Sequence, residues 1–261
     1  ARLVERAVVE AAGVRHHLRA LERLLGRDDV ARVRRRGGRR RRAAGEQDEG
    51  GGRDYAGLLA AIVGVMAVKI VVTTGLLKFN SVVLVQGCGP IGLGFVRMCV
   101  LRGAHVIACD MSAARLEAAK KLGAVDTVKV DEVEDQAQAV KDLTEDGRGV
   151  DVAIEATGVP SVWESAMHMA RPGGFVLLFG GLKKGSEVSL DANLMHYSQL
   201  TVKGVFHTTP MYVHSTFEMI KMGQFPEEIF VQNEYSIDDT EKAILEHASG
   251  AVIKNAIVYP D

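Results

Sequence analysis

Short apolar runs rich in β-branched residues alternate with longer stretches of helical character from residue 81 onward. The runs SVVLVQ (81–86) and HVIACD (105–110) are typical of strands that are buried on both faces of a parallel sheet. Strands and helices that alternate at this spacing predict an α/β fold, a doubly wound parallel sheet with right-handed crossovers. Further strands are predicted at 126–130, 149–158, 175–181 and 200–206.

The segments between the strands carry the signals of helix starts and ends. IGLGFVRMCVLRGA is interpreted as a helix that ends at Gly103, and Ser112 is the expected N-cap of the next helix. Residues 131–145 are expected to form a polar helix whose acidic residues make a solvated face. The helix SVWESAMHMA is expected to close at the turn RPGG (171–174), and a final helix and strand are predicted at about 238–259.

The loop after the first strand, GCGPIG, has the GxGxxG spacing of a dinucleotide-binding turn. Gly87 would permit the tight turn, Gly89 would let a pyrophosphate approach the backbone, and Gly92 would let helix and strand pack closely. The helix that starts at Pro90 and Ile91 would offer N–H groups and its positive dipole end to the phosphates. The motif is informative because a strand precedes it and a helix follows it. The alternative is a glycine-rich turn with a structural role only.

An acid at the end of the second strand bears on the choice of cofactor. Asp110 follows Gly92 by 18 residues and would accept hydrogen bonds from the adenosine ribose hydroxyls. A carboxylate there repels a 2′-phosphate, which favours NAD over NADP. Arg115 is the opposing signal, because it could reach such a phosphate from the following helix.

Taken in order, VLVQGCGPIGLG, VDVAIEATG, RPGGFVLLFGG and LTVKGVF resemble the cofactor domain of medium-chain zinc-dependent dehydrogenases, nearest to the sorbitol, threonine and polyol branch. The resemblance covers about residues 75–261. It implies a Rossmann domain at 81–261 and NAD-dependent oxidation of a secondary alcohol or polyol by a homo-oligomer. It also implies cofactor contacts at Thr157 and Gly158 near the nicotinamide ribose, at Gly180 and Val205 near the carboxamide, and at Lys254 near the pyrophosphate.

The zinc ligands of that family are absent from this sequence. Family members hold the metal with a cysteine, a His–Glu pair and a further acid or cysteine. Here no cysteine precedes Cys88, no His–Glu dipeptide occurs, and residues 55–81 contain no Asp or Glu. No metal site is therefore predicted, although zinc is expected for the family, and the catalytic residues are unknown apart from His207, a weak candidate for substrate contact. The alternatives are a non-catalytic NAD-binding module and a zinc-independent reductase of the quinone-reductase type.

Charge divides the chain into two unlike parts near residue 54. Residues 1–54 hold 15 arginines and nine acids, a net charge of +6, while the whole chain carries −1. RVRRRGGRRRR (32–42) lies in this part, which uses only nine residue types, each of which can be encoded by a codon that begins with G or C. We interpret 1–54 as an out-of-frame reading of coding DNA, with an aberrant segment replacing most of a catalytic domain. The alternatives are a basic arm for nucleic acid and a disordered extension.

The remaining expectations concern location and completeness. The apolar run 58–77 is long enough to span a bilayer, but Lys69 and its glycines favour a buried lead-in helix within 55–80. The three cysteines form no CxxC pair, which favours a reducing, cytoplasmic setting. The chain does not begin with Met and is expected to be a fragment. The expected partner is a small alcohol or polyol, with neither nucleic acid nor membrane.

Overall fold

The computed structural model describes residues 77–206 and 210–258, which belong to two compact units. The first unit contains the described residues up to 206, and the second contains those from 210 onward. The arginine-rich segment 1–54, the apolar run 58–77 apart from its last residue, and nearly all of the lead-in segment lie outside the described residues.

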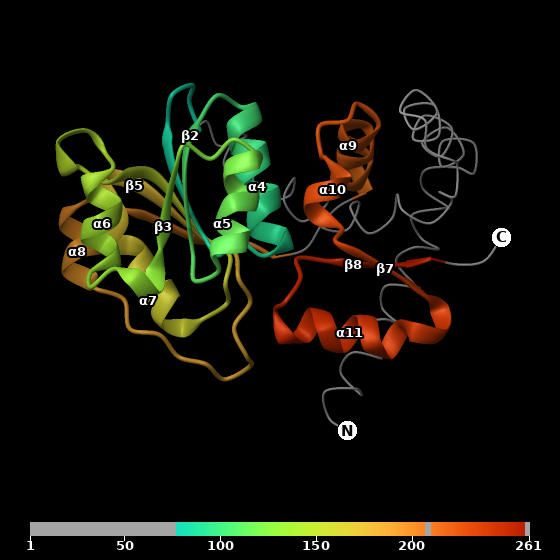
Figure 1. Cartoon of the computed structure of the whole chain (residues 1–261). Helices are drawn as coiled ribbons and strands as arrows, with labels where there is room; N and C mark the ends of the chain where they lie inside the picture. The colour runs from blue at the N-terminus through green and yellow to red at the C-terminus, as the bar shows by residue number, and fades with distance from the viewer. Residues whose placement is uncertain (1–76, 207–209, 259–261) are drawn as a thin grey trace. The chain divides into compact units, whose positions relative to one another are not determined.

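A parallel sheet flanked by helices forms the first unit (Figure 1). Its strands are β1 (Val82–Gln86), β2 (His105–Asp110), β3 (Asp126–Lys129), β4 (Val150–Glu155), β5 (Ala170–Leu178) and β6 (Thr201–Gly204). Its helices are α4 (Pro90–Leu101), α5 (Ala113–Lys121), α6 (Gln136–Asp142), α7 (Pro160–Met169) and α8 (Ala192–Tyr197). In Figure 1, α4 and α5 cover one face of the sheet, and α6, α7 and α8 cover the other.

The order of the strands confirms the predicted doubly wound sheet. The six strands lie in the order β3-β2-β1-β4-β5-β6, and all five neighbouring pairs are parallel. The chain therefore builds outward from β1 to β3 and then crosses over to start the second half at β4. In sheets of this kind, ligands bind beyond the carboxyl ends of the strands at this switch point. Here that point lies between β1 and β4.

Burial on both faces explains why the strands consist of continuous apolar runs. Val83, Leu84 and Val85 in β1 have no exposed surface. Leu84 belongs to a core cluster with Met167 of α7, while a Cγ of Val85 lies near Gly92 of α4. Complete burial of such side chains stabilises the fold by about 1.5–3 kcal/mol each.

The helix predicted at 131–145 is shorter than expected, and the acidic residues of 131–135 are exposed as predicted but precede the helix. The chain forms a 3-10 turn at Val130–Glu132 before α6 begins at Gln136. Asp131 pairs with Lys129 at 2.5 Å, which holds the acid in the turn. Asp135 accepts a hydrogen bond from the Gln138 N–H at 3.0 Å and so caps α6. A cap fixes the start of a helix, because it satisfies N–H groups that have no partner inside the helix.

The RPGG turn lies inside β5 and does not precede it. Val150 pairs with Ala170 and Val152 pairs with Phe175, so the residues between Ala170 and Phe175 loop out from the ladder. Gly173, with a φ of 70°, lies in this loop. The strand therefore begins five residues earlier than the apolar run FVLLFGG suggests.

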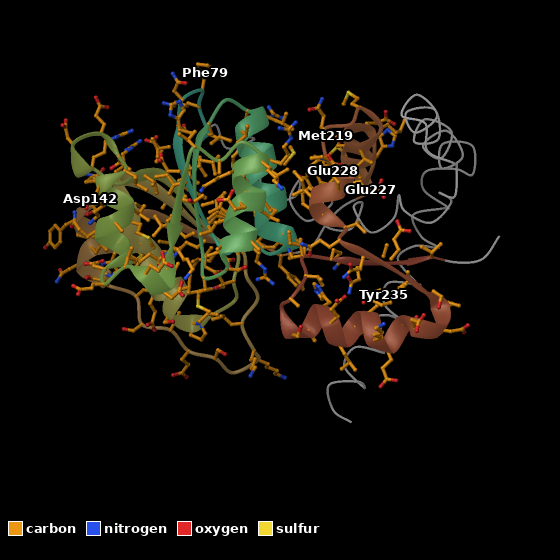
Figure 2. The ribbon with its side chains drawn as sticks, in the orientation of Figure 1. Phe79, Asp142, Met219, Glu227, Glu228 and Tyr235 are labelled. Atoms are coloured by element: carbon orange, nitrogen blue, oxygen red, sulfur yellow. The ribbon has the colours of Figure 1, made fainter. Side chains whose placement is uncertain are left out.

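The described residues of the second unit form a two-stranded parallel sheet, three α-helices and a 3-10 turn at Ile237–Asp239. Its elements are α9 (Pro210–Lys221), α10 (Glu227–Phe230), β7 (Asn233–Ser236), α11 (Thr240–Ser249) and β8 (Asn255–Val258). The predicted helix and strand at 238–259 correspond to α11 and β8. Parallel strands need a crossover, which α11 supplies between β7 and β8. Tyr235 on β7 points toward α11, where its hydroxyl donates to Glu246 at 2.9 Å (Figure 2).

None of the helices in the described part of the chain has the length and apolar character needed to cross a membrane.

Candidate cofactor-binding site

The glycine motif forms a tight turn between β1 and α4. Gly87 has a φ of +91°, a conformation that favours glycine. A Cβ on Gly92 would lie 1.7 Å from the carbonyl oxygen of Gly87, so the start of the helix is in direct contact with the turn. A Cβ on Gly87 would meet the Cγ2 of Thr157 at 2.7 Å. The geometry therefore leaves no room for a side chain at either glycine.

Gly89 differs from its two neighbours in the motif, because the space beside it is open. It is the N-cap of α4, with a φ of −67°, and no side chain caps the helix. A Cβ built on Gly89 would meet no atom of the described residues within 4 Å. Pro90 lacks an N–H, and Ile91 and Gly92 form the rest of the first turn. This helix end can therefore receive an anion that approaches the backbone.

Asp110 is fixed beside the turn by two backbone hydrogen bonds. Its Oδ2 accepts from the Cys88 N–H at 2.7 Å, and its Oδ1 accepts from the Ser112 N–H at 2.8 Å. The Gly87 N–H donates to the carbonyl oxygen of Cys109 at 2.8 Å, which ties the turn to the end of β2. Each carboxylate oxygen keeps a further lone pair for a hydroxyl group. Asp110 can thus bind a ribose from a fixed position.

The first turn of α5 begins at the other side of Asp110. The Ser112 side chain accepts from the Arg115 N–H at 3.5 Å, as expected for an N-cap. Arg115, three residues after Ser112, is half-buried.

The three cysteines are buried thiols in the interior of the first unit. Burial, and then the charge of Asp110, raise the pKa of Cys88 well above its ordinary value. Burial raises the pKa of Cys99 and of Cys109 to about 12. A nucleophile or a metal ligand must be a thiolate, so none of these groups is suited to either role at neutral pH.

The loops after β4 and β5 come together at a buried acid. Glu155, the last residue of β4, has no exposed surface. Its carboxyl group accepts hydrogen bonds from backbone N–H groups of Thr157, Gly158 and Gly180. Glu155 is not among the site residues predicted from the sequence, although a single acid in the apolar run VAIEA is a signal that could have singled it out.

The structure brings most of the expected cofactor residues to one edge of the sheet. The glycine turn and Asp110 lie at the carboxyl ends of β1 and β2, and Thr157, Gly158 and Gly180 follow β4 and β5. Val205 is half-buried just after β6. Lys254 lies in the second unit, where its carbonyl oxygen accepts from the Gln232 N–H at 3.0 Å. His207 lies outside the described residues.

Within residues 77–206 and 210–258, no three His, Cys, Asp or Glu side chains are grouped closely enough to hold a metal ion. The described residues therefore do not fit a zinc ion, whereas the open, uncapped start of α4 and the oriented carboxylate of Asp110 fit a dinucleotide.

A family model and individual relatives of known sequence both match this chain, and they agree on the family. Residues 90–222 match the family model for zinc-binding dehydrogenases. The chain is 32% identical over 169 residues to sorbitol dehydrogenase of Bacillus subtilis (strain 168), a match that covers 64% of this chain and 47% of the relative. An L-threonine 3-dehydrogenase of Shewanella putrefaciens is 32% identical over 173 residues, or 64% of this chain and 48% of the relative.

A solved dehydrogenase structure has a similar fold. The crystal structure of 2R,3R-butanediol dehydrogenase from Bacillus subtilis superposes with a TM-score of 0.67 at 27% identity, over 78% of this chain and 56% of that one. The chain thus spans about half the length of the curated relatives that it matches.

Proposed function

This chain belongs to the zinc-binding dehydrogenase family, and we propose that its six-stranded sheet binds NAD in preference to NADP. The observation that carries the proposal is the carboxylate of Asp110, held at the end of β2 by the N–H groups of Cys88 and Ser112. A carboxylate so placed accepts hydrogen bonds from the 2′- and 3′-hydroxyls of a ribose and repels a 2′-phosphate. Arg115 is the residue that would oppose this preference.

The pyrophosphate is assigned to the start of α4. Gly89 leaves open space beside the backbone, and the first turn of the helix presents N–H groups, including those of Ile91 and Gly92, together with the positive end of the helix dipole. Pro90 sets the start of the helix without using an N–H group. The nicotinamide half would then extend to the β4–β5 side of the switch point, over Thr157, Gly158 and Gly180.

Two further cofactor contacts are proposed by family resemblance alone. Val205 would offer a backbone group near the carboxamide, and Lys254 would lie near the pyrophosphate.

The proposed reaction is hydride transfer from a secondary alcohol or polyol to NAD. When bound, a zinc ion in this family polarises the alcohol oxygen and lowers its pKa. The described residues contain no group of ligands for that ion, so no catalytic step is assigned to this chain. Its own contribution is to bind and orient the cofactor. A cofactor-binding module without catalysis is the second candidate function, favoured by the same lack of metal ligands among the described residues.

Three buried cysteines, none in a disulfide within the described residues, support the proposal that the protein works in the reducing cytoplasm.

Fluorescence titration of the full chain with NADH and with NADPH tests the cofactor assignment. We expect NADH to bind at least about tenfold more tightly, a difference of about 1.4 kcal/mol. Equal affinities, or tighter binding of NADPH, would contradict the assignment and favour a reductase of the quinone-reductase type. NADH formation with sorbitol, in the presence of added Zn²⁺, then separates an active dehydrogenase from a binding module.

A further inference from the structure

We infer that Glu155 is a positioning residue, whose buried carboxylate fixes the two loops that would receive the nicotinamide half of the cofactor. The inference rests on the proposed binding of NAD. It adds a residue that contacts no cofactor itself and acts through the backbone of Thr157, Gly158 and Gly180.

The hydrogen bonds of Glu155 join two loops that are far apart in the sequence. Its Oε1 accepts from the Thr157 N–H at 2.6 Å, from the Thr157 hydroxyl at 2.5 Å and from the Gly158 N–H at 2.9 Å. Its Oε2 accepts from the Gly180 N–H at 3.1 Å, and the backbone carbonyl oxygen of Glu155 accepts from the same N–H at 3.1 Å. One carboxylate therefore holds the loop after β4 with one oxygen and the loop after β5 with the other.

The loop after β5 is held from its other side as well. The Trp163 Nε1–H of α7 donates to the carbonyl oxygen of Gly180 at 2.9 Å. The backbone N–H and the carbonyl of Gly180 thus both have fixed partners. A Cβ on Gly180 would lie 2.2 Å from the Gly158 nitrogen, which shows that the two loops are in backbone contact. Small movements of Glu155 or Trp163 would therefore be passed directly to both loops.

The place of these loops in the sheet determines which half of the cofactor they serve. The switch point lies between β1 and β4, and Asp110 marks the β2 side as the place of the adenosine ribose. The second nucleoside of a dinucleotide then lies on the side of β4 and β5. Thr157 adjoins the phosphate turn, because its Cγ2 lies 2.7 Å from the position that a Cβ on Gly87 would take. Glu155 therefore acts beyond the pyrophosphate, on the nicotinamide side.

A second acid on the same strand provides a matched control. Asp151, near the start of β4, accepts from the Val82 N–H at 2.8 Å and pairs with Arg171 at 2.5 Å. It also joins neighbouring strands through a carboxylate, but at the amino end of the sheet. Loss of either acid should weaken the fold, whereas only the loss of Glu155 should act on the cofactor edge.

The test compares Glu155→Gln and Asp151→Asn in the full chain. A glutamine at 155 presents an amide NH₂ to a backbone N–H at one of the two loops, which replaces a hydrogen bond with a repulsive contact. We expect Glu155→Gln to raise the Kd for NADH about tenfold and to leave the Kd for ADP, which lacks the nicotinamide half, within about twofold of wild type. Asp151→Asn should leave both constants near wild type while thermal unfolding shows a lower Tm.

A second variant keeps the test decisive if Glu155→Gln fails to fold. Trp163→Phe removes the hydrogen bond to the Gly180 carbonyl together with some of the packing of the indole against the core, and it should weaken NADH binding relative to ADP binding in the same direction. Equal weakening of NADH and ADP in these variants, or unchanged NADH binding, would overturn the positioning role while ADP binding by wild type would still support the adenosine site. A wild-type chain that binds neither ligand would remove the proposed function and this inference together.

Discussion

At the scale of single residues, two glycines three positions apart have different reasons to be glycine. Gly92 is required by the fold, because a Cβ there would overlap the carbonyl oxygen of Gly87. Gly89 is not required by the fold, because its φ is ordinary and the space beside it is open. The open space is what a bound pyrophosphate needs. Alanine at each position therefore separates stability from binding.

Gly92→Ala should destabilise the first unit. The new methyl would lie 1.7 Å from a backbone oxygen, so α4 must shift away from β1, at a cost of about 3 kcal/mol for such overpacking. Urea unfolding followed by circular dichroism measures this loss. A midpoint equal to that of wild type would show that the helix and the turn are not packed as described.

Gly89→Ala should leave the fold nearly unchanged and impair binding. The effect on unfolding should stay within about 1 kcal/mol, as for Gly and Ala at N-cap positions. The Kd for ADP should rise at least about tenfold, because the methyl group occupies the path of the phosphates. Gly147→Ala, at the end of the 3-10 turn Glu145–Gly147 with open space around it but a φ of 66°, is the control for substitution at an exposed glycine. Unchanged ADP binding by Gly89→Ala would contradict the assignment of the pyrophosphate to the start of α4.

These residues also show what the sequence could predict of the site. The roles of Gly87 and Gly92 follow from local backbone geometry, which the spacing of a motif records. The role of Glu155 depends on a loop 25 residues away, and only the pairing of β4 with β5 brings Gly180 to it. A contact of this kind has no local signature beyond an acid in an apolar strand.

At the scale of elements, the apolar runs of the sequence predicted the strands of the central sheet. Local hydrogen bonds from side chains, which these runs do not record, set the ends of some helices. Asp135 starts α6 five residues later than the polar pattern of 131–145 suggests, because it caps the helix. In the second unit, β7 was not predicted. Its sequence NEYS is polar and too short to show an alternating pattern, and its pairing with β8 across α11 is nonlocal.

The attachment of α11 to β7 and β8 should depend on pH at both extremes. Hydrogen bonds from Tyr235, Asn233 and Asn255 hold the pKa of Glu246 below its ordinary value, and the bond to Glu246 raises the pKa of Tyr235. The ionised Glu246 carboxylate therefore stabilises the fold at pH values above its ordinary pKa. This contribution is lost as the pH falls through the lowered pKa. The protonated Tyr235 phenol stabilises the fold at pH values below its ordinary pKa. This contribution is lost as the pH rises through the raised pKa.

Hydrogen exchange of the α11 amides therefore should be slowest near neutral pH, after correction for intrinsic rates, and faster in acid and in alkali. Tyr235→Phe should abolish the alkaline change and retain most of the acidic one, because Asn233 and Asn255 still donate to Glu246. Protection of α11 that is the same in wild type and variant at alkaline pH would contradict a role for the Tyr235–Glu246 bond.

At the scale of the whole molecule, the described residues supply a cofactor sheet and a small second unit, but no metal centre. The chain covers about half the length of its curated relatives, and the family model begins only at residue 90. The segment 1–54 lies before this match, with a net charge of +6 and nine residue types. The part of the chain that carries the family resemblance is therefore distinct in composition from the part that does not.

The composition of 1–54 leads to the prediction that another reading frame of the same DNA encodes the missing ligands. Each of the nine residue types can be encoded by a codon with G or C in first position, which a shift of one base produces when the wobble base of GC-rich codons is read first. Sequencing the coding DNA across this segment and translating all three frames should reveal a cysteine, a Gly-His-Glu and a cluster of four cysteines. Joined in frame to the sheet, these residues would supply the ligands for a zinc ion that the described residues cannot hold. Peptides from the natural protein that match the arginine-rich sequence 32–42 would contradict the prediction and establish the basic segment as genuine.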